Sequence, residues 1–250
     1  MARSPMIFAV ANQKGGVGKT TTSVNLAASL AAAEERTLLV DCDPQGNASS
    51  GVGVRRQTVE VSLYDVLIGR ASAADATRAT DVPGLDVIPA TQDLVAVELE
   101  LVDAADRATR LRAALAPVVS RYAYVVLDCP PSLGLLTLNA LVAGREVLIP
   151  SQCEYYALEG LAQLLNTVEL VTAHLNPALE VSTVLLTMYD SRTRLADQVA
   201  DEVRRHFGPL VLQPTIPRNV RVSEAPGFGQ TVITYDAGSR GAIGYVQAAR

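Results

Sequence analysis

A glycine-rich segment between a short apolar run and a helical pattern most constrains how this chain folds. Residues 7–11 have the length and character of a buried strand, and a helical pattern begins at Thr20. Between them lie Gly15, Gly16 and Gly18, which permit turns that point successive backbone N–H groups toward one place. A strand, such a loop and a helix in this order are typical of a P-loop, which surrounds a phosphate group.

Further apolar runs of strand length follow this segment, and helical patterns separate them. The runs are nearly continuous, as expected for parallel strands covered on both faces. The chain is therefore predicted to be an α/β protein with a doubly wound, mostly parallel sheet, helices on both faces and ligands at the carboxyl ends of the strands. The expected strands are residues 7–11, 37–40, 85–88, 124–127, 146–149 and 181–187, and the expected helices are 20–33, 62–68, 93–103, 107–120, 133–143, 157–174 and 195–207.

Composition limits the remaining choices. With 250 residues, 49% of them hydrophobic, the chain can bury one full core, and we expect a single P-loop domain over residues 1–250 in which 46–83 is a decorated connection. The net charge of -5 argues against a broadly basic nucleic-acid binder, so any DNA contact must come from a local patch. Apolar runs are too short for a membrane span or a signal peptide, which predicts a cytoplasmic protein.

Lysine occurs at two positions only, Lys14 and Lys19, and both lie in the glycine-rich loop. In a P-loop, Lys19 reaches the β and γ phosphates and the Thr20 hydroxyl ligates Mg²⁺. Gln13 stands where the general motif has its first glycine. Because Lys19 already serves the phosphates, Lys14 is either a solvated loop charge or has a separate task. The predicted phosphate-binding residues of this loop are Gly15, Gly16, Val17, Gly18, Lys19, Thr20 and Thr21.

Three aspartates follow strands that are expected to end at the same edge of the sheet. Asp128 ends the run 124–127 and precedes Cys129-Pro130-Pro131-Ser132, the form of a Walker B strand whose carboxylate holds Mg²⁺ through water; a turn or helix-capping aspartate is the alternative. Asp41 and Asp43 follow the run 37–40. We expect Asp43 to orient the attacking water and Asp41 to support the metal or the loop.

Taken together, these motifs resemble those of deviant Walker A ATPases of the ParA/Soj partition type. The resemblance rests on Lys14 beside the P-loop, on Asp41-x-Asp43-Pro-Gln and on Asp128-x-Pro-Pro-Ser, and it continues through residues 152–160, 187–193 and 216–226. It implies an ATPase with ATP and Mg²⁺ as cofactors, slow intrinsic turnover and an ATP-dependent sandwich homodimer. In that dimer, Lys14 of each subunit would reach the phosphates of the other and act as a catalytic residue with Lys19, Asp43 and Asp128.

The resemblance also implies residues for the base and for DNA. Pro217, Arg218 and Asn219 would lie against the adenine and ribose, with Met188 nearby. Arg192 and Arg221 would contact DNA, with Arg218 and the pair Arg204 and Arg205 as weaker additions. Residues 186–250 hold eight Arg against six Asp or Glu, so this part is mildly basic. No recognition helix is visible, which predicts DNA binding without sequence specificity.

The implied biological role is chromosome or plasmid segregation on the nucleoid, with a ParB-type protein that stimulates hydrolysis. Residues 1–12 are too few for a DNA-binding domain ahead of the loop.

Three alternatives stay open: positioning of a protein cargo on the nucleoid, a MinD-like membrane ATPase, and an electron carrier similar to the nitrogenase iron protein. The MinD reading needs a basic amphipathic helix at residues 241–250, where Arg250 is the single charge. The electron carrier would need Cys129 and Cys153 as cluster ligands, although buried strand-end cysteines explain them more simply. Tyr155 and Tyr156 are expected to pack at a strand-to-helix junction.

Overall fold

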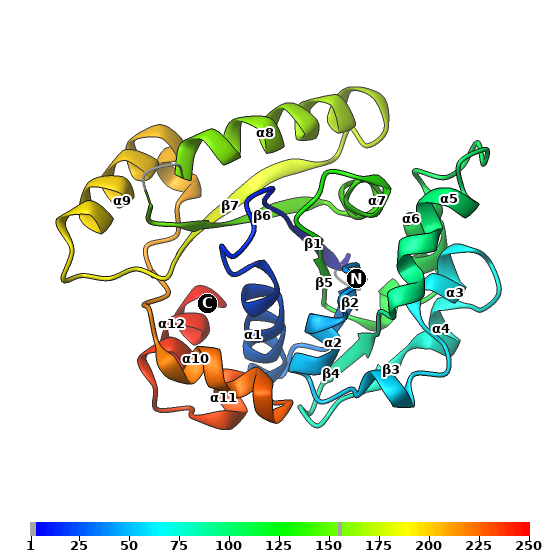
Figure 1. Ribbon diagram of the computed structural model, residues 1–250, viewed down its shortest axis with the longest axis horizontal. Helices are drawn as coiled ribbons and strands as arrows, with labels where there is room; N and C mark the ends of the chain where they lie inside the picture. The colour runs from blue at the N-terminus through cyan, green and yellow to red at the C-terminus, as the bar shows by residue number, and fades with distance from the viewer. Residues whose placement is uncertain (1–3, 155–156) are drawn as a thin grey trace.

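A seven-stranded sheet in the order β3-β4-β2-β5-β1-β6-β7 forms the centre of the molecule (Figure 1). The computed structural model describes residues 4–154 and 157–250. The strands pair in parallel except for the short β3, which is antiparallel to β4 at the edge. The strands are β1 Met6–Val10, β2 Thr37–Asp41, β3 Arg78–Ala79, β4 Leu85–Ile88, β5 Tyr124–Asp128, β6 Glu146–Gln152 and β7 Glu180–Thr187.

Successive residues of the central strands enter two separate hydrophobic clusters, one on each face of the sheet. Leu38 and Val40 of β2 face one cluster, whereas Leu39 between them faces the other. Both faces are therefore covered, which explains why the strands are apolar throughout and not at alternate positions. The predicted doubly wound sheet, with helices on both faces, is confirmed.

The helices divide between these two clusters. Residues of α1, α2, α11 and α12 enter one cluster, and residues of α3 to α9 enter the other. The helices are α1 Lys19–Ala32, α2 Asn47–Gly51, α3 Leu63–Leu67, α4 Ala73–Ala76, α5 Val97–Glu100, α6 Arg110–Leu115, α7 Leu135–Ala143, α8 Ala157–His174, α9 Arg194–Phe207, α10 Val220–Glu224, α11 Val232–Tyr235 and α12 Arg240–Ala248, with 3-10 turns η1 Arg56–Thr58, η2 Gln92–Ala96, η3 Val119–Arg121, η4 Gly208–Leu210 and η5 Ala225–Phe228.

The six predicted strands are all present, but several helices differ from expectation. The helix expected at 107–120 is only α6, because Pro117 has no N–H to donate and a 3-10 turn follows it. The helix expected at 93–103 divides into η2 and α5. Strand β3, helices α2 and α4, and helices α10 to α12 were not predicted. Tyr155 and Tyr156 lie outside the described residues.

Parallel strands bring the functional loops to one edge. Asp128 at the end of β5 pairs in register with Val10 of β1 on one side and with Asp41 of β2 on the other. The glycine-rich loop and both acidic segments therefore begin at adjacent positions. Within residues 4–154 and 157–250, no helix is long and apolar enough to cross a membrane.

Candidate functional site

The glycine-rich loop has an open inner side and a fixed base. Gly16 and Gly18 have φ angles of 74° and 85°, in the left-handed region that favours glycine. A Cβ placed on Gly15 or Gly16 would meet no atom within 4 Å, so there is open space beside both residues. Helix α1 begins directly after Gly18 and points its positive end at that space. An anion of phosphate size fits this cradle.

Hydrogen bonds to two strands hold the loop in place. The buried Asn12 side chain donates to the Pro150 carbonyl of β6 (2.8 Å) and accepts from the Lys14 N–H (3.0 Å). On the other side, the Thr187 hydroxyl of β7 donates to the Val17 carbonyl (2.8 Å). Neither side chain was singled out from the sequence, because both act through backbone groups that are distant along the chain.

The two lysines of the loop have different surroundings. Lys19 is buried, and its ammonium donates to the Lys14 carbonyl at 3.1 Å, so its side chain lies folded across its own loop. Burial lowers the pKa of Lys19, and the nearby Asp128 carboxylate opposes that shift. Lys14 points away, to Glu154, with 3.0 Å between Nζ and Oε2. Its ammonium is therefore not used within its own loop.

Asp128 presents an unpartnered carboxylate oxygen to the site. Its side chain is fully buried, and Oδ1 accepts a hydrogen bond from the Ser23 hydroxyl of α1 at 2.7 Å. Oδ2 has no partner among the described residues. Burial, and then the nearby Asp41, raise the pKa of Asp128. A buried carboxylate with a free oxygen at a phosphate site is a suitable ligand for a hydrated Mg²⁺ ion.

Asp41 has its hydrogen-bonding capacity filled by the neighbouring loop. Its Oδ2 accepts from both the N–H and the hydroxyl of Ser49, at 2.8 and 2.7 Å. Its Oδ1 accepts from the Asp43 N–H at 3.2 Å. This geometry favours loop support over metal binding for Asp41. Asp43 itself is nearly buried and accepts from the Gln45 N–H at 2.9 Å.

A cavity of about 210 Å³ opens beside the loop and collects the residues expected around the base. Gly18 and Thr21 line it from the phosphate side, and Met188 with φ of 50° lines it from the end of β7. The buried Tyr245 of α12 also contributes, and its hydroxyl lies 3.4 Å from that of Thr22. The remaining predicted base contacts, Pro217, Arg218 and Asn219, line the same cavity.

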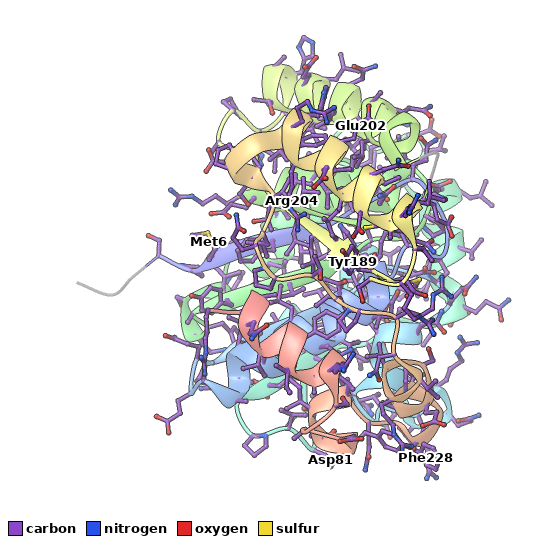
Figure 2. The ribbon with its side chains drawn as sticks, turned by 90° about the vertical axis from the view of Figure 1, so that its left-hand side faces the viewer. Met6, Asp81, Tyr189, Glu202, Arg204 and Phe228 are labelled. Carbon is purple, nitrogen blue, oxygen red and sulfur yellow. The ribbon has the colours of Figure 1, made fainter. Side chains whose placement is uncertain are left out.

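The two arginines expected at DNA lie in the segment after β7 and in α10, and their chain neighbours Met188 and Asn219 line the base cavity on this side of the molecule. Arg192 is bound in a two-pronged contact by Asp190, at 2.8 and 2.7 Å, and Arg221 contacts Glu224 and Asp236. Figure 2 looks onto this side, with Tyr189 between α9, which carries Arg204, and the C-terminal helices. Arg218 is also exposed here, next to the base cavity. Each of Arg192 and Arg221 thus carries its own carboxylate partners.

The cysteines are buried and unpaired. The thiols of Cys42 and Cys129 lie 3.8 Å from carbonyls of their own strands. Within the described residues, no group of three or more His, Cys, Asp or Glu side chains is arranged to hold a metal ion. The positions of the three cysteines, buried at the ends of strands, match the interpretation that they are small packing residues.

Fold and loop geometry together define a P-loop nucleotide-binding protein of the α/β class. A family profile described as an AAA domain matches residues 5–181. The chain is 57% identical to the sporulation initiation inhibitor protein Soj of Bacillus subtilis, over 98% of this chain and 96% of that protein. It is 54% identical to the chromosome partitioning protein ParA of Caulobacter vibrioides, over 100% of this chain and 95% of that protein. The chain belongs to the ParA/Soj family of partitioning ATPases.

Solved structures agree with this fold. Cobyrinic acid a,c-diamide synthase from Mycobacterium smegmatis, with bound ADP and magnesium, is 39% identical with a TM-score of 0.86, covering 98% of this chain and 92% of that one. The cell division ATPase MinD of Pyrococcus furiosus is 25% identical with a TM-score of 0.81, covering 100% and 97%. The sequence identity to ParA and Soj is higher than the identity to either of these two solved structures.

Proposed function

We propose that this protein is a Mg²⁺-dependent ATPase that forms an ATP-bound homodimer on nonspecific DNA, and that a ParB-type protein stimulates its hydrolysis. The observation that carries the proposal is the direction of Lys14. Lys19 lies over the loop of its own subunit, whereas Lys14 points outward to an exposed glutamate. An ammonium directed away from its own loop is positioned to serve the phosphates of a second subunit.

Residues of the site fit ATP and Mg²⁺. The cradle at Gly15 and Gly16 is open, and Lys19, Thr20 and Asp128 surround it. Thr20 and Asp128 would hold Mg²⁺, whose charge offsets that of the phosphate oxygens. Lys19 binds the terminal phosphates, and Asp43 holds the attacking water in position. Lys14, supplied by the facing subunit, stabilises charge that develops on the transferred group.

Slow intrinsic turnover fits this arrangement, because the catalytic set is incomplete in one subunit. DNA binding by Arg192 and Arg221 would be weak in a single chain, and a dimer doubles the number of phosphate contacts. ATP would thereby control attachment to DNA and association with the nucleoid. A single domain fits this role, since the nucleotide site and the arginines proposed to contact DNA are carried by one sheet and its helices. The partner protein determines whether the cargo is a chromosome, a plasmid or a protein assembly.

The alternative of a MinD-like membrane ATPase has less support than the proposed function. Helix α12, at the end of the described chain, packs against α1 and buries Ala242 and Tyr245 in the core. A helix used in this way offers little apolar surface to a lipid layer.

The test is binding to nonspecific duplex DNA with ATP, with ADP and without nucleotide, using Asp43→Ala to suppress turnover. We expect binding with ATP alone, together with a dimer by light scattering. Lys19→Ala, which removes the phosphate contact, should bind DNA in none of the three conditions. DNA binding that is equal in all nucleotide states would contradict the proposal.

A further inference from the structure

The segment formed by η2, α5 and the following turn, residues 92–103, has an apolar face on each side. Its inner face is buried in the hydrophobic core through Leu94, Val97 and Leu101. Its outer face carries three large apolar side chains at helical spacing, and these are exposed to 59% (Val95), 78% (Leu99) and 55% (Val102). Single exposed apolar residues are ordinary, but three that lie on one face of a segment and do not stabilise the fold mark an interaction surface.

Carboxylates surround this apolar stripe. Residues 92–106 contain five acidic side chains and no Lys or Arg, and all five are exposed: Asp93, Glu98, Glu100, Asp103 and Asp106. Two arginines border the segment at its C-terminal end, where Arg110 pairs with Asp106 (2.9 Å) and Arg107 donates to the Val102 carbonyl (2.6 Å), so the surface keeps an excess of carboxylates. A cavity of about 310 Å³ beside Thr91 and Asp93 is also lined by Glu60 and Asp65, against one cation, Arg70. A ligand that matches both features is apolar on one side and carries lysines or arginines at its edges.

We propose that the outer face of residues 92–103 is the docking surface for a basic, amphipathic segment of the partner that stimulates hydrolysis. This inference rests on the proposed function, and it assigns to that partner a place on this chain. The apolar side of the segment covers Val95, Leu99 and Val102, and its cations meet the surrounding carboxylates.

This surface lies next to the loop that carries Asp43. Val95 and Gln92 line a cavity of about 390 Å³ together with Pro44 and Gln45, the two residues after Asp43. Deeper in the molecule, the Ala90 N–H donates to the Ser49 hydroxyl at 3.1 Å, and Ser49 holds Asp41. A partner seated on residues 92–103 therefore contacts, directly or through one side chain, the loop that positions the attacking water.

The same segment also contacts the loop that follows Asp128. Glu98 accepts a hydrogen bond from the Leu135 N–H at 2.9 Å, at the first residue of α7. A Cβ on Gly134 would collide with the Glu98 carboxylate, so the two segments are in close contact. One docking event can thus act on both acidic loops of the site, which gives the partner a physical route to accelerate hydrolysis.

Partner docking at this place leaves the DNA surface free. In Figure 1, α5 lies on the right of the molecule, whereas α9 and α10, next to the predicted DNA arginines, lie on the left. The chain can therefore hold DNA and partner together, and hydrolysis can be triggered while the complex is still on DNA.

The experiment measures DNA-activated ATP hydrolysis against the concentration of the purified ParB-type protein from the same source. Leu99→Ser removes the centre of the stripe, and Asp103→Lys reverses one surrounding charge. Leu170→Ser and Glu169→Lys, both exposed on α8, are the matched controls. We expect Leu99→Ser to raise the partner concentration for half-maximal stimulation by about tenfold or more, and Asp103→Lys by about threefold or more. The basal rate and ATP-dependent DNA binding should stay unchanged in all four variants, and the controls should be stimulated like the wild type.

Several outcomes would overturn the inference. Normal stimulation of both Leu99→Ser and Asp103→Lys would show that the partner docks elsewhere. Loss of the ATP-dependent dimer in Leu99→Ser, with a native circular dichroism spectrum, would show that a second copy of the chain covers this face. If the wild type binds DNA with ATP but no ParB-type protein stimulates it, the partner assignment of the proposed function fails, and this inference fails with it.

Discussion

At the scale of single residues, the ion pair between Lys14 and Glu154 would set a cost on formation of the proposed dimer. In that dimer, Lys14 would have to leave Glu154 before it could reach the phosphates of the other subunit. Both side chains are partly exposed, so each pair stabilises the free chain by roughly 0.5 kcal/mol, and a dimer breaks two. We expect Glu154→Gln to tighten the ATP-dependent dimer by about fivefold, measured by analytical ultracentrifugation.

Two variants define what this result means. Glu180→Gln removes a carboxylate elsewhere on the surface and should leave the dimer affinity unchanged. Lys14→Ala should keep ATP binding and lose the dimer. If Lys14→Ala dimerised normally, the outward direction of Lys14 would have no functional meaning.

The buried aspartates at the strand ends make the stability of the nucleotide-free protein depend on pH. Burial raises the pKa of Asp41 to about 6 and that of Asp128 further, from a usual value near 4. The folded state then holds protons that the unfolded state releases, so the stabilising effect is complete at about pH 4 and is lost as pH rises toward 8. Between pH 5 and 8 we expect a loss of about 2 kcal/mol, or roughly 5 °C in thermal midpoint.

Removing one of these charges tests the cause. Asp128→Asn should raise the thermal midpoint at pH 8 in the absence of nucleotide and flatten its pH dependence. Ser132→Ala, on the exposed loop nearby, is the control. A midpoint in wild type that rises from pH 5 to pH 8 would contradict the assigned direction.

The residues of the site differ in how well a sequence can predict them. The loop from Lys14 to Thr20 and the acids at 41, 43 and 128 belong to motifs contiguous along the chain, and the structure brings them together. Ser23, Ser49 and Asn12 could not be found, because a serine inside a helix or an asparagine after a strand has no distinctive pattern. Their importance comes from the carboxylates and carbonyls that the fold places beside them.

At the scale of elements, strands followed from the sequence more closely than helices did. Parallel strands covered on both faces are continuous apolar runs with sharp ends, so their bounds were predicted within about one residue, except at the C-terminal end of β6, which continues to Gln152. The short helices depend on tertiary contacts more than on periodicity. Helix α12 illustrates this, because Gly241 and Gly244 weaken its pattern, yet both are buried against neighbouring segments.

The packing of α12 against α1 predicts a coupled loss of stability and nucleotide affinity. Tyr245 is fully buried, lines the base cavity and has its hydroxyl next to that of Thr22. We expect Tyr245→Ala to destabilise the fold by about 4 kcal/mol, since it leaves a cavity, and to weaken ATP binding. Tyr245→Phe should cost only about 1 kcal/mol and keep ATP affinity. Urea unfolding and a fluorescent nucleotide titration measure the two effects, and equal ATP affinity in Tyr245→Ala would exclude a role in the base site.

At the scale of the whole molecule, its surfaces occupy different places on one rigid sheet. The nucleotide site lies at the carboxyl edge, the basic side chains lie around α9 and α10, and the acidic, apolar face of residues 92–103 lies on the opposite side (Figure 1). With a net charge of -5, the proposed DNA contact needs such a separation, because DNA would have to approach a locally basic side of an acidic protein. In the proposed dimer, binding of ATP would then act on DNA affinity through the number of chains joined.

The salt dependence of DNA binding reports how many chains contact the duplex. Each phosphate contact contributes a slope of about -0.9 to log affinity against log salt concentration. Arg192→Gln removes one contact from a monomer but two from a dimer, so in the ATP-bound Asp43→Ala background we expect the slope to become less steep by about 1.8. Arg112→Gln, exposed on α6 on the far side, should leave the slope unchanged. A change of about 0.9 for Arg192→Gln would mean that single chains bind, and no change would mean that Arg192, held by Asp190, stays away from the phosphates.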